Sequence, residues 1–326
     1  MSHSATEEQI EQWQETLSEL KQQLNTTLIG QSLIVRETLT TLLAGGHLLV
    51  EGVPGLGKTL LVRALAASLD AKFARIQFTP DLMPTDVTGH AVYDMKEGEF
   101  RIQKGPAFTN FLLADEINRA PAKTQAALLE VMQEQQITIE GTSYRAHKPF
   151  MVLATQNPIE QEGTYPLPEA ELDRFMMKVL IDFPNEKDEV KLVHWATKGI
   201  MNDSMNVDGL QPKLNGETLT EIQEYVTHIE VDRAVLEYAV DLVRATRAWP
   251  GVSIGAGPRA SIGIVRCARA SAMLEQRNYV LPDDVKRVAK AVLRHRIQLS
   301  AELEIEGQSS DQIIESILAH TQAPAQ

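Results

Sequence analysis

The sequence predicts an α/β fold, with a parallel sheet flanked by helices, followed by an all-helical domain. As far as Pro184, short apolar runs typical of buried strands alternate with helical segments. This alternation favours a parallel sheet that helices cover on both faces. From about residue 217 onward, helical patterns follow one another with no convincing strand between them.

The bulk composition narrows the class of protein. The chain has 326 residues with 31 basic and 44 acidic side chains, a net charge of −13. A molecule this acidic is a poor partner for nucleic acid or an anionic membrane, so we expect neither. The single cysteine, Cys267, excludes an intrachain disulfide and fits a reducing compartment. The N-terminus does not resemble a signal peptide, and no apolar run approaches the ~18 residues of a membrane span, so we expect a cytoplasmic protein without membrane insertion.

The first segments predict two helices and then a strand. Apolar residues from Ile10 to Leu24 recur every three or four positions, which predicts an N-terminal helix within residues 1–27. A second helix follows residues 29–31 and reaches about Ala44, and residues 48–50 form a short buried strand. Further strands are predicted at residues 73–78, 111–114, 151–154 and 177–181. The α/β core is expected to span residues 28–199.

A glycine-rich loop follows the first strand. Residues 52–59 match the pattern GxxxxGK[ST] in full, with a strand before it and a helix after it, which indicates a P-loop NTPase that binds ATP. Glycines let the backbone surround phosphate groups, and the next helix directs its positive end at them. Lys58 would place a charge at the β- and γ-phosphates, and the hydroxyl of Thr59 would bind Mg²⁺. The predicted ATP-binding residues here are Gly52, Val53, Pro54, Gly55, Leu56, Gly57, Lys58, Thr59 and Leu60.

An apolar strand ends in two adjacent carboxylates. Residues 111–116 read Phe-Leu-Leu-Ala-Asp-Glu. Such a run alone is more often a solvated strand end, but together with a phosphate loop it predicts Mg²⁺-dependent ATP hydrolysis. Asp115 would hold the Mg²⁺ shell, and Glu116 would polarise the attacking water.

Three arginines and one asparagine are further candidates for the hydrolytic site. Negative charge spreads over the γ-phosphoryl group during hydrolysis, so an arginine delivered there by the same or a neighbouring chain is worth ~10³–10⁵ in rate. Arg119, Arg174 and Arg259 are candidates, although a single arginine is more often part of a surface ion pair. The amide of Asn157 could orient water, although asparagine before proline is also common in turns.

Two insertions and a helical second half complete the chain. Alternating patterns near residues 83–108 and 135–148 predict two β-hairpins. A helix is expected at 186–198, and residues 200–216 are rich in Gly, Asn, Asp and Ser and are predicted to be a linker. The domain from 217 to 326 is expected to hold helices at 219–228, 231–247, 259–277, 282–297 and about 309–320, followed by a tail.

Together these segments resemble the MoxR family of AAA+ ATPases over roughly residues 28–300. Residues 52–59 are similar to its Walker A motif and 112–116 to Walker B, and the runs at 83–89, 115–125 and 154–158 are close to MoxR patterns. The resemblance implies that the helical domain is a lid. It also implies roles for five residues: Gly30 and Gln31 at the adenine-pocket entry, Asn157 as first sensor, Arg174 as arginine finger, and Arg259 as lid-domain sensor. Arg119 would be an interface residue that acts across subunits.

The resemblance implies an assembly and a biological role as well. A finger that reaches a neighbour completes the active site only between two subunits, so a ring, often of six, is expected. Similar rings remodel or mature client proteins in the manner of chaperones, with partners that contain von Willebrand factor A domains. Their hairpins face the central pore or a client; the alternative is two solvated hairpins without a partner.

Two other functions remain as alternatives. One is a motor subunit of a chelatase-like or restriction-like complex, which shares the insert architecture. The other is a nucleotide-switched signalling protein that reads guanine. Its nearest sequence support, residues 185–188, has the order Asn-Glu-Lys-Asp rather than NKxD.

Overall fold

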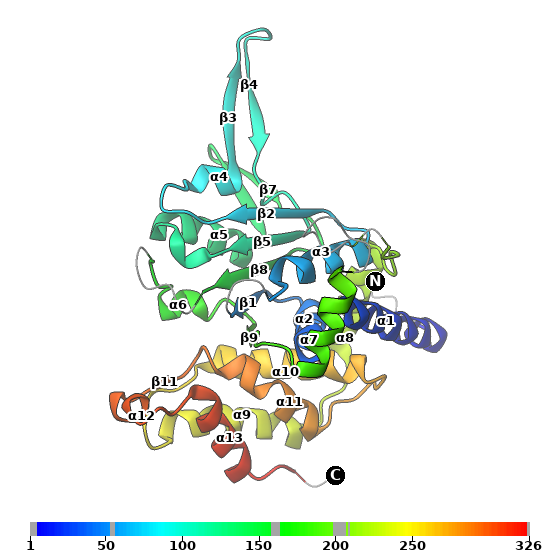
Figure 1. Ribbon diagram of the computed structural model, residues 1–326, viewed down its shortest axis with the longest axis vertical. Helices are drawn as coiled ribbons and strands as arrows, with labels where there is room; N and C mark the ends of the chain where they lie inside the picture. The colour runs from blue at the N-terminus through cyan, green and yellow to red at the C-terminus, as the bar shows by residue number, and fades with distance from the viewer. Residues whose placement is uncertain (1–4, 53–55, 158–163, 198–206, 208, 325–326) are drawn as a thin grey trace.

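A five-stranded parallel sheet forms the centre of the larger part of the molecule (Figure 1). The computed structural model describes residues 5–52, 56–157, 164–197, 207 and 209–324. The strand order is β2-β5-β8-β1-β9, and every neighbouring pair is parallel. The bounds are β1 (Leu48–Glu51), β2 (Phe73–Gln77), β5 (Phe111–Asp115), β8 (Met151–Gln156) and β9 (Met177–Leu180). The predicted fold class and all the predicted strands of the sheet are confirmed.

Both faces of the sheet are buried, which explains why its strands are continuous apolar runs. Successive strand residues point to opposite faces, and the two faces belong to two separate hydrophobic clusters. In β1, Leu48 and Val50 pack in one cluster and Leu49 in the other. Helices α1 (Glu7–Thr27), α2 (Ser32–Leu43) and α3 (Lys58–Ser68) contribute to the first cluster, and α5 (Ala122–Glu134) contributes to the second.

The N-terminal helix packs as its periodicity predicts. In α1 the spaced apolar side chains Trp13, Leu17, Leu20 and Leu24 are buried. The helix begins at a capping box in which Thr6 accepts from the backbone N–H of Gln9. None of the helices in the described part of the chain is long and apolar enough to cross a membrane.

The last third of the described chain forms the predicted helical lid, which shares a hydrophobic core with one face of the sheet. Its helices are α8 (Gly216–His228), α9 (Arg233–Ala248), α10 (Pro258–Leu274), α11 (Pro282–Leu293), α12 (Ala301–Ile305) and α13 (Ser310–His320). Leu219, Leu242, Ile264 and Ile314 lie in the same cluster as Leu48 of the sheet. Residues 200–206 and 208 of the predicted linker lie outside the described residues, as does residue 198 of the predicted helix, here α7 (Glu186–Thr197).

The expectation that no strand interrupts the lid helices is wrong in one place. Strand β10 (Val252–Ile254) pairs with β11 (Gln298–Leu299) in an antiparallel ribbon. Strands of three and two residues are too short for a periodic apolar pattern, and their pairing joins positions far apart in the sequence. The predicted helix 282–297 also ends early, at Leu293, so that the residues after it turn toward the sheet.

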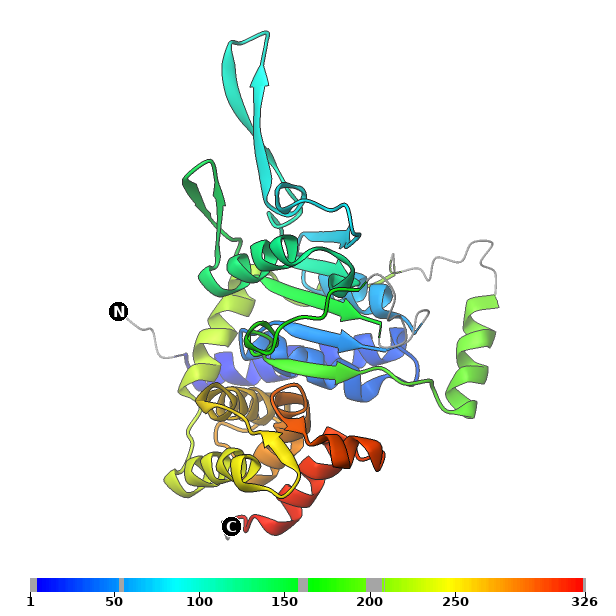
Figure 2. The ribbon, with the colours of Figure 1, turned by 90° about the vertical axis from the view of Figure 1, so that its left-hand side faces the viewer.

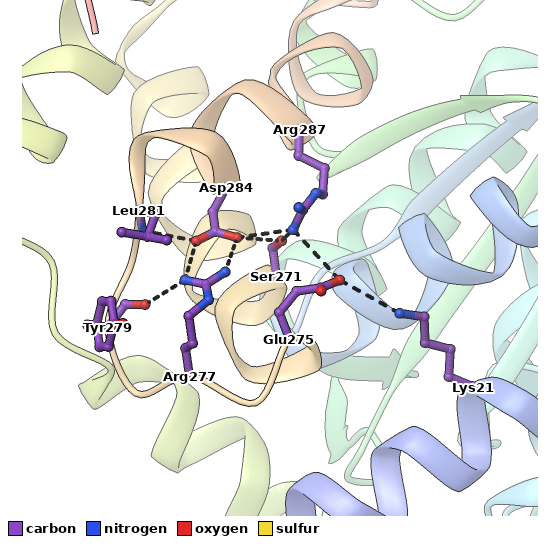
Figure 3. A network of polar contacts seen from close by, with 8 residues as sticks. All are labelled: Lys21, Ser271, Glu275, Arg277, Tyr279, Leu281, Asp284 and Arg287. Atoms are coloured by element: carbon purple, nitrogen blue, oxygen red, sulfur yellow. Dashed lines mark hydrogen bonds and ion pairs between the residues drawn. The ribbon is translucent and has the colours of Figure 1, made fainter. Parts of the chain in front are cut away.

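A buried carboxylate in α11 organises the lid (Figure 3). Asp284 is fully buried and accepts two hydrogen bonds of 2.7 Å from the guanidinium of Arg277. Arg287 and Ser271 donate to it at 3.2 and 3.0 Å. Glu275 links Arg287 to Lys21 of α1, at 3.8 and 3.7 Å, so the network continues from the lid to the N-terminal helix.

Both predicted hairpins are present. The longer, β3 (Gly89–Asp94) and β4 (Glu99–Lys104), projects from the body of the molecule (Figures 1 and 2). The shorter is β6 (Gln136–Ile139) and β7 (Thr142–Arg145). The short helix α4 (Pro84–Thr88) before β3 was not predicted from the sequence. At its end, Gly89 has φ +95°, and an added Cβ would lie 2.2 Å from the carbonyl oxygen of Gln103, so only glycine fits where the hairpin leaves the body.

Candidate functional site

The described ends of the predicted phosphate loop, the acidic pair and the first-sensor residue Asn157 lie at the carboxyl ends of three adjacent strands. Glu51, the last residue of β1, is paired with Gln156 of β8. The backbone N–H of the following residue, Gly52, donates to the carbonyl of Gln156 at 3.4 Å. Asn157, which follows Gln156, is 7% exposed. An added Cβ at Gly52 would lie 2.6 Å from the carbonyl oxygen of Ile181. Glycine is therefore required where β1 ends against the neighbouring chain segment.

The end of the phosphate loop passes directly into α3. Of the loop, Val53, Pro54 and Gly55 lie outside the described residues. Gly57 precedes the helix with φ +84°, in the left-handed region that favours glycine. The first intrahelical bond runs from the N–H of Leu61 to the carbonyl of Gly57. The N–H groups of residues 58–60 therefore have no intrahelical acceptor and can bind an anion at the positive end of the helix.

The ammonium group of Lys58 lies among backbone carbonyls at this edge. It donates to the carbonyls of Gly52 and Gln156, the second at 3.4 Å. Burial lowers the pKa of Lys58 from its ordinary value, and the charges of Asp115 and Glu116 oppose this shift. The lysine is thus a partly desolvated cation close to both acidic residues.

The carboxylate of Asp115, at the end of β5, contacts a guanidinium group and a hydroxyl group. Its Oδ2 lies 2.6 Å from Nη2 of Arg75 in β2, and its Oδ1 accepts from the Thr155 hydroxyl at 2.6 Å. Neither Arg75 nor Thr155 was singled out from the sequence. The sequence shows Arg75 as a charged residue within a predicted strand. Its contact with Asp115 could not be predicted, because that contact depends on the register of β2 with β5.

Glu116 is held in an unusual backbone conformation. Its φ is +55°, which is uncommon for a residue with a side chain and is frequent at functional sites. The N–H of Glu116 donates to the Thr155 hydroxyl at 2.9 Å, and its Oε2 accepts from Gln77 at 2.6 Å and from Arg119 at 3.0 Å. Arg119 therefore contacts Glu116 of its own chain, whereas the resemblance suggested a role across an interface. Gln77, like Arg75, comes from β2 and was missed.

Gly30 and Gln31 lie beside the end of β9, on the same side as the phosphate loop. The amide of Gln31 donates to the carbonyl of Asp182 at 3.2 Å. Gly30 has φ +80°, and an added Cβ would lie 3.1 Å from side-chain carbons of Pro184 and Asp188. The predicted adenine-pocket entry is therefore a tight contact between the start of α2 and the segment that leads into α7.

Arg174 lies at the opposite end of the strands. It precedes β9, which runs parallel to β1 with Leu48 beside Met177 and Glu51 beside Leu180. Strands rise ~3.3 Å per residue, so more than ~10 Å of sheet separates the start of β9 from the end of β1. In Figure 2 the strands of the sheet point in one direction, and the short helix α6 (Glu169–Leu172), which leads into β9, lies at their starting end.

Arg259, at the start of α10, lies with Arg174 and not with the phosphate loop. The two arginines line a common pocket of about 220 Å³ together with Arg266 and Arg296. Arg259 is 3.5 Å from Asp173, the residue before Arg174. The structure thus gathers basic side chains at the amino ends of the strands, whereas Lys58 lies beyond the carboxyl end of β1.

Two protein-family models match the chain. The model for the ATPase family associated with various cellular activities (AAA) matches residues 47–177, which include the phosphate loop, the acidic pair, Asn157 and Arg174. The model for the AAA lid domain matches residues 244–317, which include Arg259.

Curated relatives and a solved structure are similar over most of the chain. The chaperone MoxR1 of Mycobacterium tuberculosis is 43% identical over 310 residues, which cover 91% of this chain and 79% of that protein. The protein MoxR of Paracoccus denitrificans is 33% identical over 315 residues, which cover 89% of this chain and 91% of that protein. The crystal structure of an ATPase candidate from Cytophaga hutchinsonii has a TM-score of 0.90 at 42% identity and covers 98% of both chains.

Proposed function

The chain belongs to the MoxR family of AAA+ ATPases, and on this premise we propose that it hydrolyses ATP with Mg²⁺ in a ring and remodels or matures client proteins. The observation that carries the proposal is the meeting of Lys58, Asp115, Glu116 and Asn157 at the start of α3. These groups come from three neighbouring strand ends. Their side chains supply a cation, two carboxylates and an amide around helix N–H groups that can bind phosphate.

The donor set fits Mg²⁺ and a triphosphate. Hydroxyl and carboxylate oxygens are ligands that Mg²⁺ accepts, and Thr59 and Asp115 offer one of each. The ion pair between Asp115 and Arg75 shows that the Asp115 carboxylate accepts a cationic partner at this position, which is consistent with a Mg²⁺ ligand. Bound Mg²⁺ would neutralise phosphate charge and orient the phosphoryl oxygens. The residues proposed to bind ATP are Gly30, Gln31, Gly52, Val53, Pro54, Gly55, Leu56, Gly57, Lys58, Thr59 and Leu60.

Glu116 and Asn157 are the residues proposed to activate and orient the attacking water. Glu116 is the base that polarises the attacking water, and it would exchange its contacts with Gln77 and Arg119 for that water. Asn157 lies beside the phosphate loop, where its amide can hold the water in line with the γ-phosphate.

The position of Arg174 and Arg259 supports an active site shared between subunits. They line a pocket at the end of the sheet remote from their own Lys58, so the γ-phosphate that they stabilise belongs to a neighbour. The resulting contact is heterologous, with the ATP face of one subunit against the arginine face of the next, and such contacts close into rings. We propose a ring of six, which is frequent among similar proteins.

The client-directed role is supported by the relatives. One of them is named a chaperone, and by this relationship we propose a chaperone-like ring in the cytoplasm, with a partner that contains a von Willebrand factor A domain. The proposed division is a core at 28–199, a linker at 200–216 and a lid at 217–326. Hydrolysis would move the lid relative to the core.

The test compares two site variants with the unaltered protein in the presence of Mg²⁺. Lys58→Ala is expected to weaken ATP binding measured by calorimetry. Glu116→Gln is expected to bind ATP normally while phosphate release falls ~10²-fold or more, because a positioned base contributes ~10²–10⁴ in rate. Normal turnover by Glu116→Gln would exclude its role, and a protein that neither binds nor cleaves ATP would overturn the whole proposal.

Partner and nucleotide identity need separate measurements. Glu116→Gln is expected to hold an ATP-loaded oligomer, so affinity capture with this variant should retain the client or the partner. Calorimetry with ATP and GTP distinguishes this function from a guanine-nucleotide switch, which would prefer GTP.

A further inference from the structure

The turn that follows the lid helix α11 contacts the segment that carries Arg174. The guanidinium of Arg296 donates to the backbone carbonyls of Asp173 at 3.2 Å, Phe175 at 2.6 Å and Met176 at 3.1 Å. It also donates to the carboxylate of Asp173 at 2.7 Å. The ring of His295, the residue before it, contacts the carbonyl of Phe175 at 3.1 Å. One lid arginine thus contacts three residues around Arg174.

Only an arginine can make this set of contacts. The side chain of Arg296 is 5% exposed, and a charge buried to this extent requires partners for its N–H groups. The guanidinium has five N–H donors in a rigid planar fork, and here they reach acceptors on both sides of residue 174. A lysine ammonium is a single flexible point charge and cannot hold several carbonyls in one geometry.

A second lid arginine faces the same carboxylate. Oδ1 of Asp173 accepts from Arg296 in the turn after α11, and Oδ2 lies 3.5 Å from Arg259 of α10. Within the described residues, the guanidinium of Arg174 makes no hydrogen bond or ion pair of its own; its backbone N–H bonds to the carbonyl of Glu171. The direction of Arg174 therefore depends on the backbone that the lid holds.

We propose that Arg296 is a positioning residue that joins the lid to the arginine-finger segment of the same subunit, residues 173–176. This inference rests on the proposed function, in which Arg174 completes the site of a neighbour. A lid movement in one subunit then displaces the finger presented to the next subunit. The coupling acts through Arg296 and Asp173, and Arg296 itself does not touch the nucleotide of its own chain.

The experiment compares Arg296→Lys with a matched control, Arg294→Lys. Arg294 lies two positions earlier, is 9% exposed, pairs with Asp311 at 2.9 Å and donates to the carbonyl of Lys178, but does not contact the finger segment. Arg296→Lys should lower kcat by ~10- to 100-fold, since a misplacement of ~1 Å can cost ~10²-fold. Its affinity for ATP should be unchanged. Arg294→Lys should lower the thermal midpoint by a similar amount while kcat changes less than about twofold, within the ordinary scatter of additive effects.

A mixing experiment separates positioning of the finger from general damage. Lys58→Ala subunits have an intact finger but no working ATP site. Mixed with Arg296→Lys subunits, they should restore part of the activity, because each supplies what its neighbour lacks. If Arg296→Lys instead damaged the ATP site of its own subunit, mixing with Lys58→Ala subunits would restore no activity. If Arg296→Lys does not fold, Asp173→Asn, which retains the carbonyl acceptors, is judged by the same kcat, affinity and mixing criteria.

The outcomes distinguish this inference from the proposed function. An equal loss of kcat in both lysine variants, a loss of ATP affinity with Arg296→Lys, or no gain on mixing would overturn the role of Arg296. Full activity of Arg174→Ala would instead remove the finger assignment on which the inference rests.

Discussion

At the residue scale, Asp284 shows how one buried carboxylate supports the lid. Asp284→Ala would leave Arg277 and Arg287 without their main acceptor. Breaking a buried ion pair costs ~3–5 kcal/mol, and because the arginines are 20% and 30% exposed, water compensates in part. We expect a loss near the lower end, ~3 kcal/mol, in urea unfolding.

The neighbouring residue provides the control for Asp284. Asp283 is 61% exposed and pairs with Lys286 at 3.3 Å, so Asp283→Ala should cost less than ~1 kcal/mol. Equal losses in the two variants would show that burial of Asp284 does not determine its contribution.

Glu37 of α2 should make stability depend on pH. Burial raises the pKa of Glu37 to about 7, against the opposing charges of Arg294 and Arg36. The folded state therefore binds this proton more tightly than the unfolded chain, whose carboxyl has a pKa near 4.5. The stability that the folded protein has while Glu37 is protonated is fully present below pH ~4.5 and is lost as pH rises to ~7.

The variant Glu37→Gln tests this dependence, since an amide resembles the neutral carboxyl. Its free energy of unfolding should match the unaltered protein near pH 4.5 and exceed it by up to ~3 kcal/mol at pH 8, the linkage of a shift of this size. The measurement is the urea midpoint as a function of pH in both proteins. A variant less stable at pH 8 would contradict the raised pKa.

At the element scale, the hairpin β3–β4 exposes several large apolar side chains. Tyr93 and Phe100 pack edge to face with their centroids 5.2 Å apart, yet Phe100 is 73% exposed and Met95 91% exposed. Exposed apolar clusters of this kind mark binding surfaces. The hairpin projects from the body (Figure 1), so it can contact a partner without disturbing the ATP site.

Substitution of the hairpin should separate client response from basal hydrolysis. Replacing Val92 and Tyr93 by serine is expected to leave basal ATPase and the thermal midpoint unchanged, and to reduce the stimulation of ATPase by the partner captured with Glu116→Gln. Glu97→Gln, in the turn of the same hairpin, is the control. Loss of basal and stimulated activity together would indicate misfolding instead of a client surface.

At the scale of the whole molecule, the residues proposed for ATP binding and the proposed arginine finger lie at opposite ends of the sheet. Lys58 follows the carboxyl end of β1, whereas Arg174 precedes the amino end of β9. A lone subunit cannot bring them together, so specific ATPase activity should rise with protein concentration across the range in which subunits dissociate. Specific activity that stays flat over that range, measured beside sedimentation, would contradict a shared site.

Much of the fold followed from the sequence because it depends on near neighbours in the chain. The strands of a doubly covered sheet are continuous apolar runs, and the phosphate loop needs its glycines, lysine and threonine in order. The acidic pair ends a strand that is itself apolar. These features predicted the core and the location of Lys58, Asp115 and Glu116, and local alternation of apolar and polar residues predicted the two hairpins.

The rest required tertiary structure, because it depends on which distant segments lie together. The register of β2 with β5 pairs Gln77 with Asp115 and leaves Arg75 two positions away, from where its guanidinium reaches the Asp115 carboxylate. The turn after α11 places Arg296 against residues more than a hundred positions earlier. The short β10–β11 ribbon and the grouping of Arg259 with Arg174 have the same origin. The sequence by itself determined which groups are candidates to bind and cleave a triphosphate. Only the pairing of the strands and the packing of the lid on the sheet decided which end of the molecule presents each group, since both depend on contacts that local patterns do not encode.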